Sequence, residues 1–179
     1  PIFRSYNTVT SNRFFQNYTA ILNSYTITGN TGVGEVILSW FDVTSKTITS
    51  NTDGSYTITI PYNWSGTVTP SKAGYTFVPT NRTYSNVTAN QVNQNFNEII
   101  DKFEIKFSLG GTGNGKIKIN GVSHTLPYNE TFNYNSQITI EASAAIGSNF
   151  TSWSGDLSGN TNPTNILVTS AKNINVNFT

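Results

Sequence analysis

The sequence predicts an all-β protein with two small β-sandwich domains in tandem and an extended segment at the N-terminus. Apolar and polar residues alternate in short runs that end at Gly, Asn or Pro, as in FEIKFSL (103–109) and QITIEAS (137–143). This period of two is typical of half-buried strands. Only 11% of the residues are charged, and Thr, Asn and aromatic residues take the place of helix formers. No run of helical period is long enough to predict a helix.

The spacing of turn residues divides the chain into three parts. Residues 1–23 form an N-terminal extension, residues 24–100 a first domain, and residues 101–179 a second domain. Both domains end alike, because VNQNF (92–96) and NVNF (175–178) each place Asn beside a last Phe.

In the first domain the clearest signal is TDGSYTITI (52–60). Its Asp53-Gly54 pair predicts a hairpin turn, because Gly supplies the positive φ that such turns need. In the strand that follows, Tyr56, Ile58 and Ile60 occupy every second position, so their side chains are expected to share one face and point toward the core. Further strands are expected at YTITG (25–29), at EVILSWF (35–41) with Val36, Leu38 and Trp40 inward, within 66–87 with Pro70 and Pro79 at strand ends, and at VNQNFNEI (92–99).

In the second domain, turns that contain Gly separate the expected strands. The Asn120-Gly121 pair is a strong signal for a tight hairpin. On the first strand, Phe103, Ile105, Phe107 and Leu109 are expected to face inward. The expected strands are 103–109, 115–121, 137–143, 165–170 and 173–178.

The composition argues against several classes of partner. The formal net charge is +1, and without a basic stripe interleaved with aromatics we do not expect nucleic acid to bind. The chain has no Cys, which rules out disulfides and thiolate metal sites. No apolar run approaches the roughly 18 residues of a membrane span. Since the chain begins at Pro1, we expect a mature chain that has lost a signal peptide, or one cut from a longer protein.

No catalytic, cofactor or metal site is predicted. His124 is interpreted as a solvated residue after a turn, because no Ser lies in a nucleophile elbow. Asp53 and Asp156 lie in Gly-rich turns without the acidic ladder that calcium needs, so each is expected to bond its own turn. A glycosidase pair could still meet in space, but small sandwiches offer no deep cleft. The other carboxylates are dispersed: Glu35, Asp42, Glu98, Asp101, Glu104, Glu130 and Glu141.

Two sets of residues are candidates for contact with sugars. Trp64 lies in the turn region Pro61–Gly66 and is expected to be the exposed aromatic, so it is the candidate glycan contact. Asn-x-Ser/Thr sequons are candidate N-glycosylation sites, although chance gives about six in a chain so rich in Asn. They begin at Asn17, Asn63, Asn81, Asn86, Asn129, Asn149 and Asn177.

Two resemblances are carried by longer motifs. GNGKIKINGVSHTLPY (113–128) and the W-S-G-D signature at Trp153–Asp156 resemble the divergent internalin-B-type repeat of secreted and surface proteins. YTITGNTGVGEVIL (25–38) and the stretch Gly66–Pro79 resemble carboxypeptidase-regulatory-like, or prealbumin-like, surface modules. The resemblances imply a buried Trp153 and non-catalytic spacer, display or adhesion roles outside the cell.

The N-terminal segment matches neither resemblance and leads to the functional prediction. It carries more large apolar side chains than a solvated linker needs: Phe3, Tyr6, Phe14, Phe15, Tyr18 and Leu22. We predict that a neighbouring copy accepts this segment as an added strand, as in donor-strand complementation. Head-to-tail contacts of this kind do not close, so they build filaments. The strands ending at Phe96 and Phe178 are the expected acceptor edges.

The expected function is therefore that of a non-catalytic extracellular structural protein, a subunit of a surface filament or pilus-like fibre whose partner is itself. The alternative is an adhesion, glycan-binding or spacer module of a larger secreted enzyme or cell-surface adhesin. In that case Trp64 and neighbouring loops would contact glycans or other cell-surface components.

Overall fold

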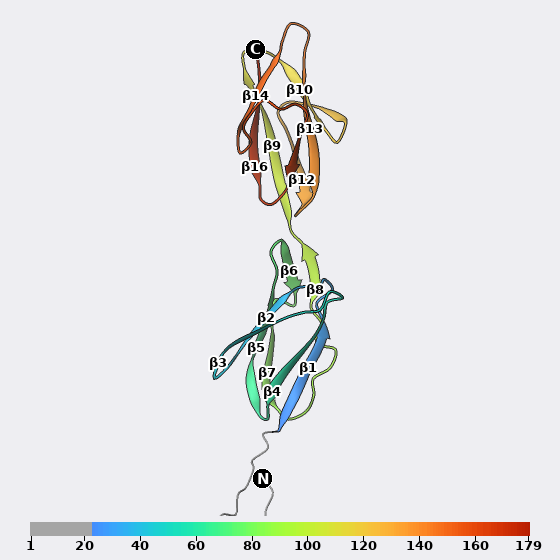
Figure 1. Cartoon of the computed structure of the whole chain (residues 1–179), viewed down its shortest axis with the longest axis vertical. Helices are drawn as coiled ribbons and strands as arrows, with labels where there is room; N and C mark the ends of the chain where they lie inside the picture. Colours follow the sequence, from blue (N-terminus) through green and yellow to red (C-terminus); the bar gives the residue numbers. More distant parts are fainter. Residues whose placement is uncertain (1–22) are drawn as a thin grey trace, which may run out of the picture. The chain divides into compact units, whose positions relative to one another are not determined.

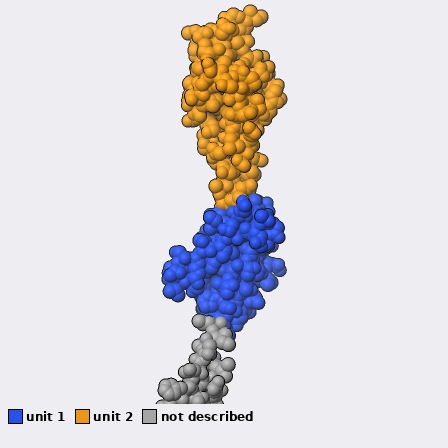
Figure 2. Space-filling view, in the orientation of Figure 1, with its two compact units in different colours: residues 1–71, 77–98 blue, residues 72–76, 99–179 orange. Residues whose placement is uncertain are grey.

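A computed structural model describes residues 23–179 of the chain. Within these residues the protein is all-β, as predicted, with strands β1 to β16 and no helix (Figure 1). None of the described residues could therefore cross a membrane as a helix. The described chain divides into two compact units (Figure 2). Unit 1 contains residues 23–71 and 77–98, and unit 2 contains residues 72–76 and 99–179.

Unit 1 contains a four-stranded sheet of order β3-β2-β5-β7 and the antiparallel pair β1–β4. Its strands are β1 (Ser24–Asn30), β2 (Ile37–Asp42), β3 (Thr44–Thr49), β4 (Ser55–Pro61), β5 (Trp64–Ser71) and β7 (Arg82–Val87). The strands β6 (Tyr75–Val78) and β8 (Asn97–Ile100) pair with each other where the chain passes from one unit to the next. Alternate residues form the core, including the predicted Val36, Leu38, Trp40, Tyr56, Ile58 and Ile60.

The predicted hairpin at Asp53-Gly54 is wrong. β4 pairs with β1, where Ile58 lies opposite Ile27, and β3 pairs with β2 instead. Gly54 does have a positive φ of 82°, and its N–H donates to the carbonyl of Asn51 at 2.9 Å. This turn passes the chain from one sheet to the other. The turn residues therefore determine where the chain changes direction. Contacts between residues far apart in the sequence determine which strand β4 pairs with.

A segment outside the named strands covers the second edge of β1. Residues 90–96 run beside β1, and Gln91 exchanges backbone hydrogen bonds of 2.8 Å with Thr26 and Thr28. Phe96 is buried at the end of this segment, ahead of β8. Phe96 therefore does not end a strand, and the acceptor edge predicted there is wrong.

Unit 2 is a β-sandwich of two four-stranded sheets, of order β11-β10-β13-β15 and β12-β9-β16-β14. Its strands are β9 (Lys102–Gly111), β10 (Gly115–Ile119), β11 (Val122–Thr125), β12 (Tyr128–Asn133), β13 (Gln137–Ala144), β14 (Phe150–Gly155), β15 (Thr164–Leu167) and β16 (Lys172–Phe178). Side chains from both sheets, including Ile105, Ile117 and Ile140, form one core. Trp153 is 2% exposed within this core, as predicted.

The last strand of unit 2 lies inside a sheet. β16 pairs in parallel with β9 and antiparallel with β14, so neither of its edges is open. The acceptor edge predicted at Phe178 is therefore wrong. The inward position predicted for Leu109 is also wrong, because this side chain is 43% exposed. Leu109 lies beyond the part of β9 that β12 covers, which ends at Phe107.

Candidate functional site: open sheet edges

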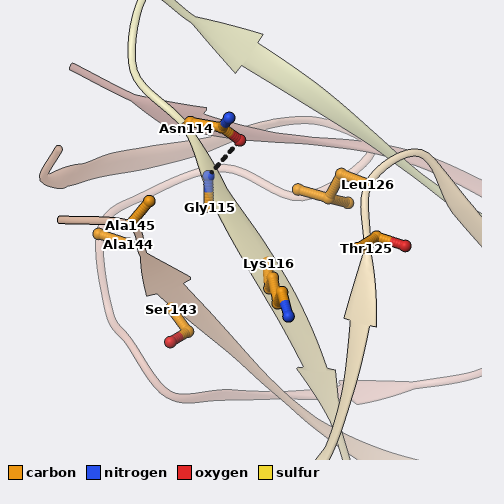
Figure 3. Close-up of a pocket in the computed structure, with 8 residues that line it drawn as sticks. All are labelled: Asn114, Gly115, Lys116, Thr125, Leu126, Ser143, Ala144 and Ala145. Atoms are coloured by element: carbon orange, nitrogen blue, oxygen red, sulfur yellow. Dashed lines mark hydrogen bonds between the residues drawn. The ribbon is translucent and has the colours of Figure 1, made fainter.

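A hollow on unit 2 carries little chemistry. It measures about 500 Å³ and lies on unit 2 between the start of β10 and the ends of β11 and β13 (Figure 3). Its lining residues are Asn114, Gly115, Lys116, Thr125, Leu126, Ser143, Ala144 and Ala145. Lys116 is the one ionisable side chain among them. The side-chain oxygen of Asn114 accepts a hydrogen bond of 2.8 Å from the N–H of Gly115. The hollow therefore has no pair of groups that could exchange a proton.

A second hollow, of about 340 Å³, lies over β9 and β12. Its carboxylate, Glu104, accepts a hydrogen bond from the side-chain amide of Asn129 and pairs with Lys106 at 3.3 Å. The amide of Asn129 and then Lys106 hold the pKa of Glu104 below its ordinary value. The carboxylate of Glu104 is thus ionised, and its oxygens already bond to Asn129 and Lys106. It is therefore a poor proton donor.

The described residues bring together no group of three or more His, Cys, Asp or Glu side chains that could hold a metal ion. His124 follows the Asn120-Gly121 turn, as predicted, and lies on β11, where its side chain is half-buried. Its ring stacks on Tyr128 with 3.9 Å between the ring centroids. The buried polar side chains of the described chain are Thr31 and Ser50, whose hydroxyls bond to each other at 3.3 Å.

The two turn aspartates behave differently. Asp53 accepts hydrogen bonds from the N–H and hydroxyl of Ser55, at 2.9 and 2.7 Å, as predicted for a turn former. These bonds lower the pKa of Asp53. Asp156 does not bond its own turn, which corrects the prediction. It accepts the N–H of Asn173 at 2.7 Å instead, because β16 begins beside it.

The expected exposure of Trp64 is wrong. This side chain is 6% exposed, because β5 begins at Trp64 and turns the indole inward. Its Nε1–H donates to the carbonyl of Phe41 at 3.0 Å, and its ring lies 6.1 Å from that of Tyr84. Trp64 is thus part of the core and cannot serve as a sugar platform.

The other sugar and assembly candidates are placed as follows. Asn63, Asn81, Asn86, Asn129 and Asn149 are exposed, and Asn177 is half-buried. Their glycosylation stays a prediction. Asn17 and the six assembly candidates Phe3, Tyr6, Phe14, Phe15, Tyr18 and Leu22 lie outside the described residues.

The edge of β4 that faces away from β1 is open. The backbone groups of Thr26 and Thr28 in β1 bond to residues 90–96. The residues of β1 that alternate with them therefore direct their backbone N–H and C=O groups toward β4. Opposite residues in an antiparallel pair either both bond across the pair or both point away from it. Thr57 and Thr59, which lie opposite Thr28 and Thr26, therefore point their N–H and C=O groups outward. Within residues 23–179 no backbone partner meets these four groups.

The outer edge of β3 is open in the same sense but carries a charge. The N–H of Ser50 donates to the carbonyl of Val36 at 2.8 Å, which by the same alternation leaves Thr47 pointing outward. Lys46 lies on the core-facing side of β3, directly opposite Trp40. Its Nζ bonds to Asp42 at 2.7 Å.

The outer edge of β12 repeats this arrangement with the opposite charge. The N–H of Tyr134 donates to the carbonyl of Asp101 at 2.8 Å, so Thr131 of β12 points its backbone groups outward. Glu130 lies on the face of β12 that also carries Tyr128 and Phe132, both of which pack against the core.

A charged side chain on the inner face of an edge strand discourages pairing, because an added strand would bury it. β3 and β12 are guarded edges in this sense, through Lys46 and Glu130. β4 has no charged residue, and neither does its partner β1. The remaining unit 2 edges are short or covered: β11 and β15 have four residues each, and the N–H of Trp153 in β14 donates to Gly159 at 2.7 Å.

The open edge of β4 is therefore the candidate functional site. It escaped the sequence reasoning, which expected acceptor edges at the domain ends. A signal was present, because SYTITIP (55–61) alternates over seven residues without a charge, whereas the runs of β3 and β12 each contain one.

Comparisons with known proteins bear on both units. A family model for the divergent InlB B-repeat domain matches residues 108–179, which confirms the resemblance predicted for that part of the chain. This match covers less than half of the chain. The resemblance of the first domain to carboxypeptidase-regulatory-like modules stays a prediction. No curated protein matches the chain.

Among solved structures, the Bacillus anthracis TIE protein aligns with 87% of this chain at a TM-score of 0.56 and 11% identity. The chain spans 33% of the length of that structure. Two major pilins of Streptococcus pyogenes, T-13 and T3.2, align with 88% of this chain and 97% of their own length, at 9% identity and TM-scores of 0.35 and 0.32. At such identities, the TIE alignment supports the fold alone.

Proposed function

We propose that this protein is a non-catalytic structural subunit at an extracellular surface, and that copies of it join by adding the N-terminal segment of one chain to an open sheet edge of another. The observation that carries the proposal is the unguarded edge of β4, where Thr57 and Thr59 offer two N–H and two C=O groups without backbone partners in the described chain. An exposed edge of this kind is a template for another strand.

Three further observations support this proposal. Neither of the two hollows described above holds an arrangement for acid–base chemistry, and the described residues bring together no group of three or more His, Cys, Asp or Glu side chains that could hold a metal ion. The match to the InlB B-repeat family model supports a role at a bacterial surface. The N-terminal segment alternates Tyr18, Ala20 and Leu22, which is a strand pattern.

The test is negative-stain electron microscopy of the full chain beside its Thr19→Pro/Ala20→Pro variant. Two consecutive prolines remove backbone N–H groups from both edges of an added strand, whatever its register. We expect filaments from the wild-type chain and single particles from the variant. Single particles from both chains, or filaments from both, would contradict the proposal.

A second candidate function is that of a spacer or adhesion module in a longer surface protein. It is favoured by one observation: the aligned region makes up only a third of the TIE protein structure (33%). Trp64 would play no part in such binding, since it is buried. Monomers at every concentration, together with further domains in the parent chain, would support this candidate.

A further inference from the structure

We propose that the acceptor in this assembly is β4 of unit 1, and that residues 17–22 of a second copy add to its open edge. The inference rests on the proposed function and adds to it the acceptor strand, the donor residues and the requirement that they come from different chains.

The donor pattern matches the strands it would join. Asn17-Tyr18-Thr19-Ala20 in the N-terminal segment repeats the order of Ser24-Tyr25-Thr26-Ile27 in β1 and Ser55-Tyr56-Thr57-Ile58 in β4. In β4 the Tyr and Ile side chains are buried and Thr57 is exposed. A strand with the same alternation would place Tyr18, Ala20 and Leu22 on the core side and Thr19 on the solvent side of the extended sheet.

The edge itself is suited to a backbone partner. Tyr56, Ile58 and Ile60 are at most 4% exposed, so β4 presents no apolar slot that needs filling. Attraction would come mainly from the free backbone groups of Thr57 and Thr59, together with the carbonyl of Pro61. Backbone hydrogen bonds of this kind can form with many donor sequences. Because β4 carries no charged side chain, an added strand would bury no charge there.

The connection favours a donor from a second copy over the chain's own segment. Leu22 is separated from the start of β1 by Asn23 alone, and the carbonyl of Asn23 accepts the N–H of Tyr62 at 2.8 Å. A strand added beyond β4 would lie two strand spacings from β1, about 10 Å. Crossing that distance takes about three extended residues, which would consume part of the matching run itself. A second copy meets no such limit.

The test uses full-length chains with one edge disabled. The Thr59→Pro variant removes an outward N–H while sparing the ladder to β1, which is where Pro is tolerated in a sheet. Thr57→Pro makes the same change at the second open position. The matched control is Thr131→Pro, the same substitution at an outward N–H on the guarded edge of β12. We expect T59P and T57P to lose filaments and T131P to keep them.

Complementation then tests whether donor and acceptor belong to different chains. T59P keeps its donor, and T19P/A20P keeps its acceptor. Each alone should remain monomeric, and an equimolar mixture should give a 1:1 complex by size-exclusion chromatography with light scattering. A mixture that stays monomeric would overturn donation between copies, and would point to the chain's own segment on β4.

The outcomes separate this inference from the proposed function. Filaments lost in T19P/A20P but kept in folded T59P and T57P would overturn β4 as acceptor and leave strand addition standing. Filaments lost in T59P but kept in T19P/A20P would mean that β4 pairs with an edge of a second copy, which overturns the donor. Filaments kept in all variants would overturn both.

A wild-type experiment covers the case in which the proline variants fail to fold. A synthetic peptide of residues 14–23 should bind growing ends and shorten wild-type filaments, and the same peptide with the two prolines should not. Equal filament lengths with both peptides would overturn the inference.

Discussion

At the scale of residues, burial decides what each polar or aromatic side chain can do. The hydroxyl of Tyr56 donates to the carbonyl of Gln94, and burial raises the pKa of this phenol. The indole N–H of Trp64 donates a hydrogen bond to the carbonyl of Phe41. The polar atoms of these two side chains are therefore satisfied within the core. Asp53 is the contrasting case, since its carboxylate is exposed and holds a turn together.

The turn at Asp53 yields a prediction about pH. Its bonds to Ser55 lower the pKa of the folded carboxyl below the ordinary value of 3.8. The charge therefore stabilises the folded state above about pH 4, and this contribution is lost as the pH falls through the lowered pKa. We expect the stability difference between wild type and Asp53→Asn to be constant near neutral pH and to shrink below pH 4. Urea unfolding from pH 2 to 7 measures it, and parallel pH profiles would contradict the account.

At the scale of elements, hydrogen-bond alternation separates neighbouring positions on β4. Ile58 bonds across to Ile27 of β1, whereas Thr59 points outward. A proline at Ile58 removes a ladder bond and a buried side chain, and loss of a buried Ile side chain alone costs about 2–5 kcal/mol. I58P should therefore lower the free energy of unfolding of unit 1 by at least about 2 kcal/mol. T59P should cost clearly less.

Urea unfolding of the two β4 variants, followed by the fluorescence of the buried Trp residues, measures this difference. T19P/A20P serves as the background so that assembly does not add to stability. Equal losses in I58P and T59P would show that the alternation derived for β4 is wrong.

The sequence predicted strands well and their partners poorly. Alternation placed Ile58, Ile105 and Ile117 in the core, because the period of two is a local property. It could not show that β16 pairs in parallel with β9, since the pairing joins residues far apart in the chain. The expected acceptor edge at Phe178 failed for that reason.

Exposure at the margins of elements was equally hard to predict. The sequence predicts a turn at Trp64 because Pro61 precedes it, but the turn ends before Trp64, and β5 directs the indole toward the core. Leu109 lies on the same face of β9 as Phe107, but the neighbouring strand β12 pairs with β9 only as far as Phe107. The side chain of Leu109 is therefore left exposed. Both residues lie at the margin of an element, where a shift of the boundary by one or two residues decides whether a side chain is buried.

At the scale of the whole molecule, each unit has its own core, and the described strands differ in how their free edges are protected. Two open edges carry an inward charge, Lys46 on β3 and Glu130 on β12, and β4 carries none. This difference is the basis for assigning assembly to β4. Charge patterning on edges is how sheet proteins avoid unwanted pairing, so an edge without it is the one that can be used.

Strand addition at β4 requires that the outward N–H groups of Thr57 and Thr59 become paired when copies assemble. Amide hydrogen exchange, resolved to single residues, tests it most directly in wild-type filaments and in monomeric T19P/A20P. Ile58, bonded to β1 in both, is the internal control and should exchange slowly in each sample. We predict that Thr57 and Thr59 exchange fast in the monomer and slowly in the filament. Equally fast exchange of both amides in the two samples would contradict strand addition at β4.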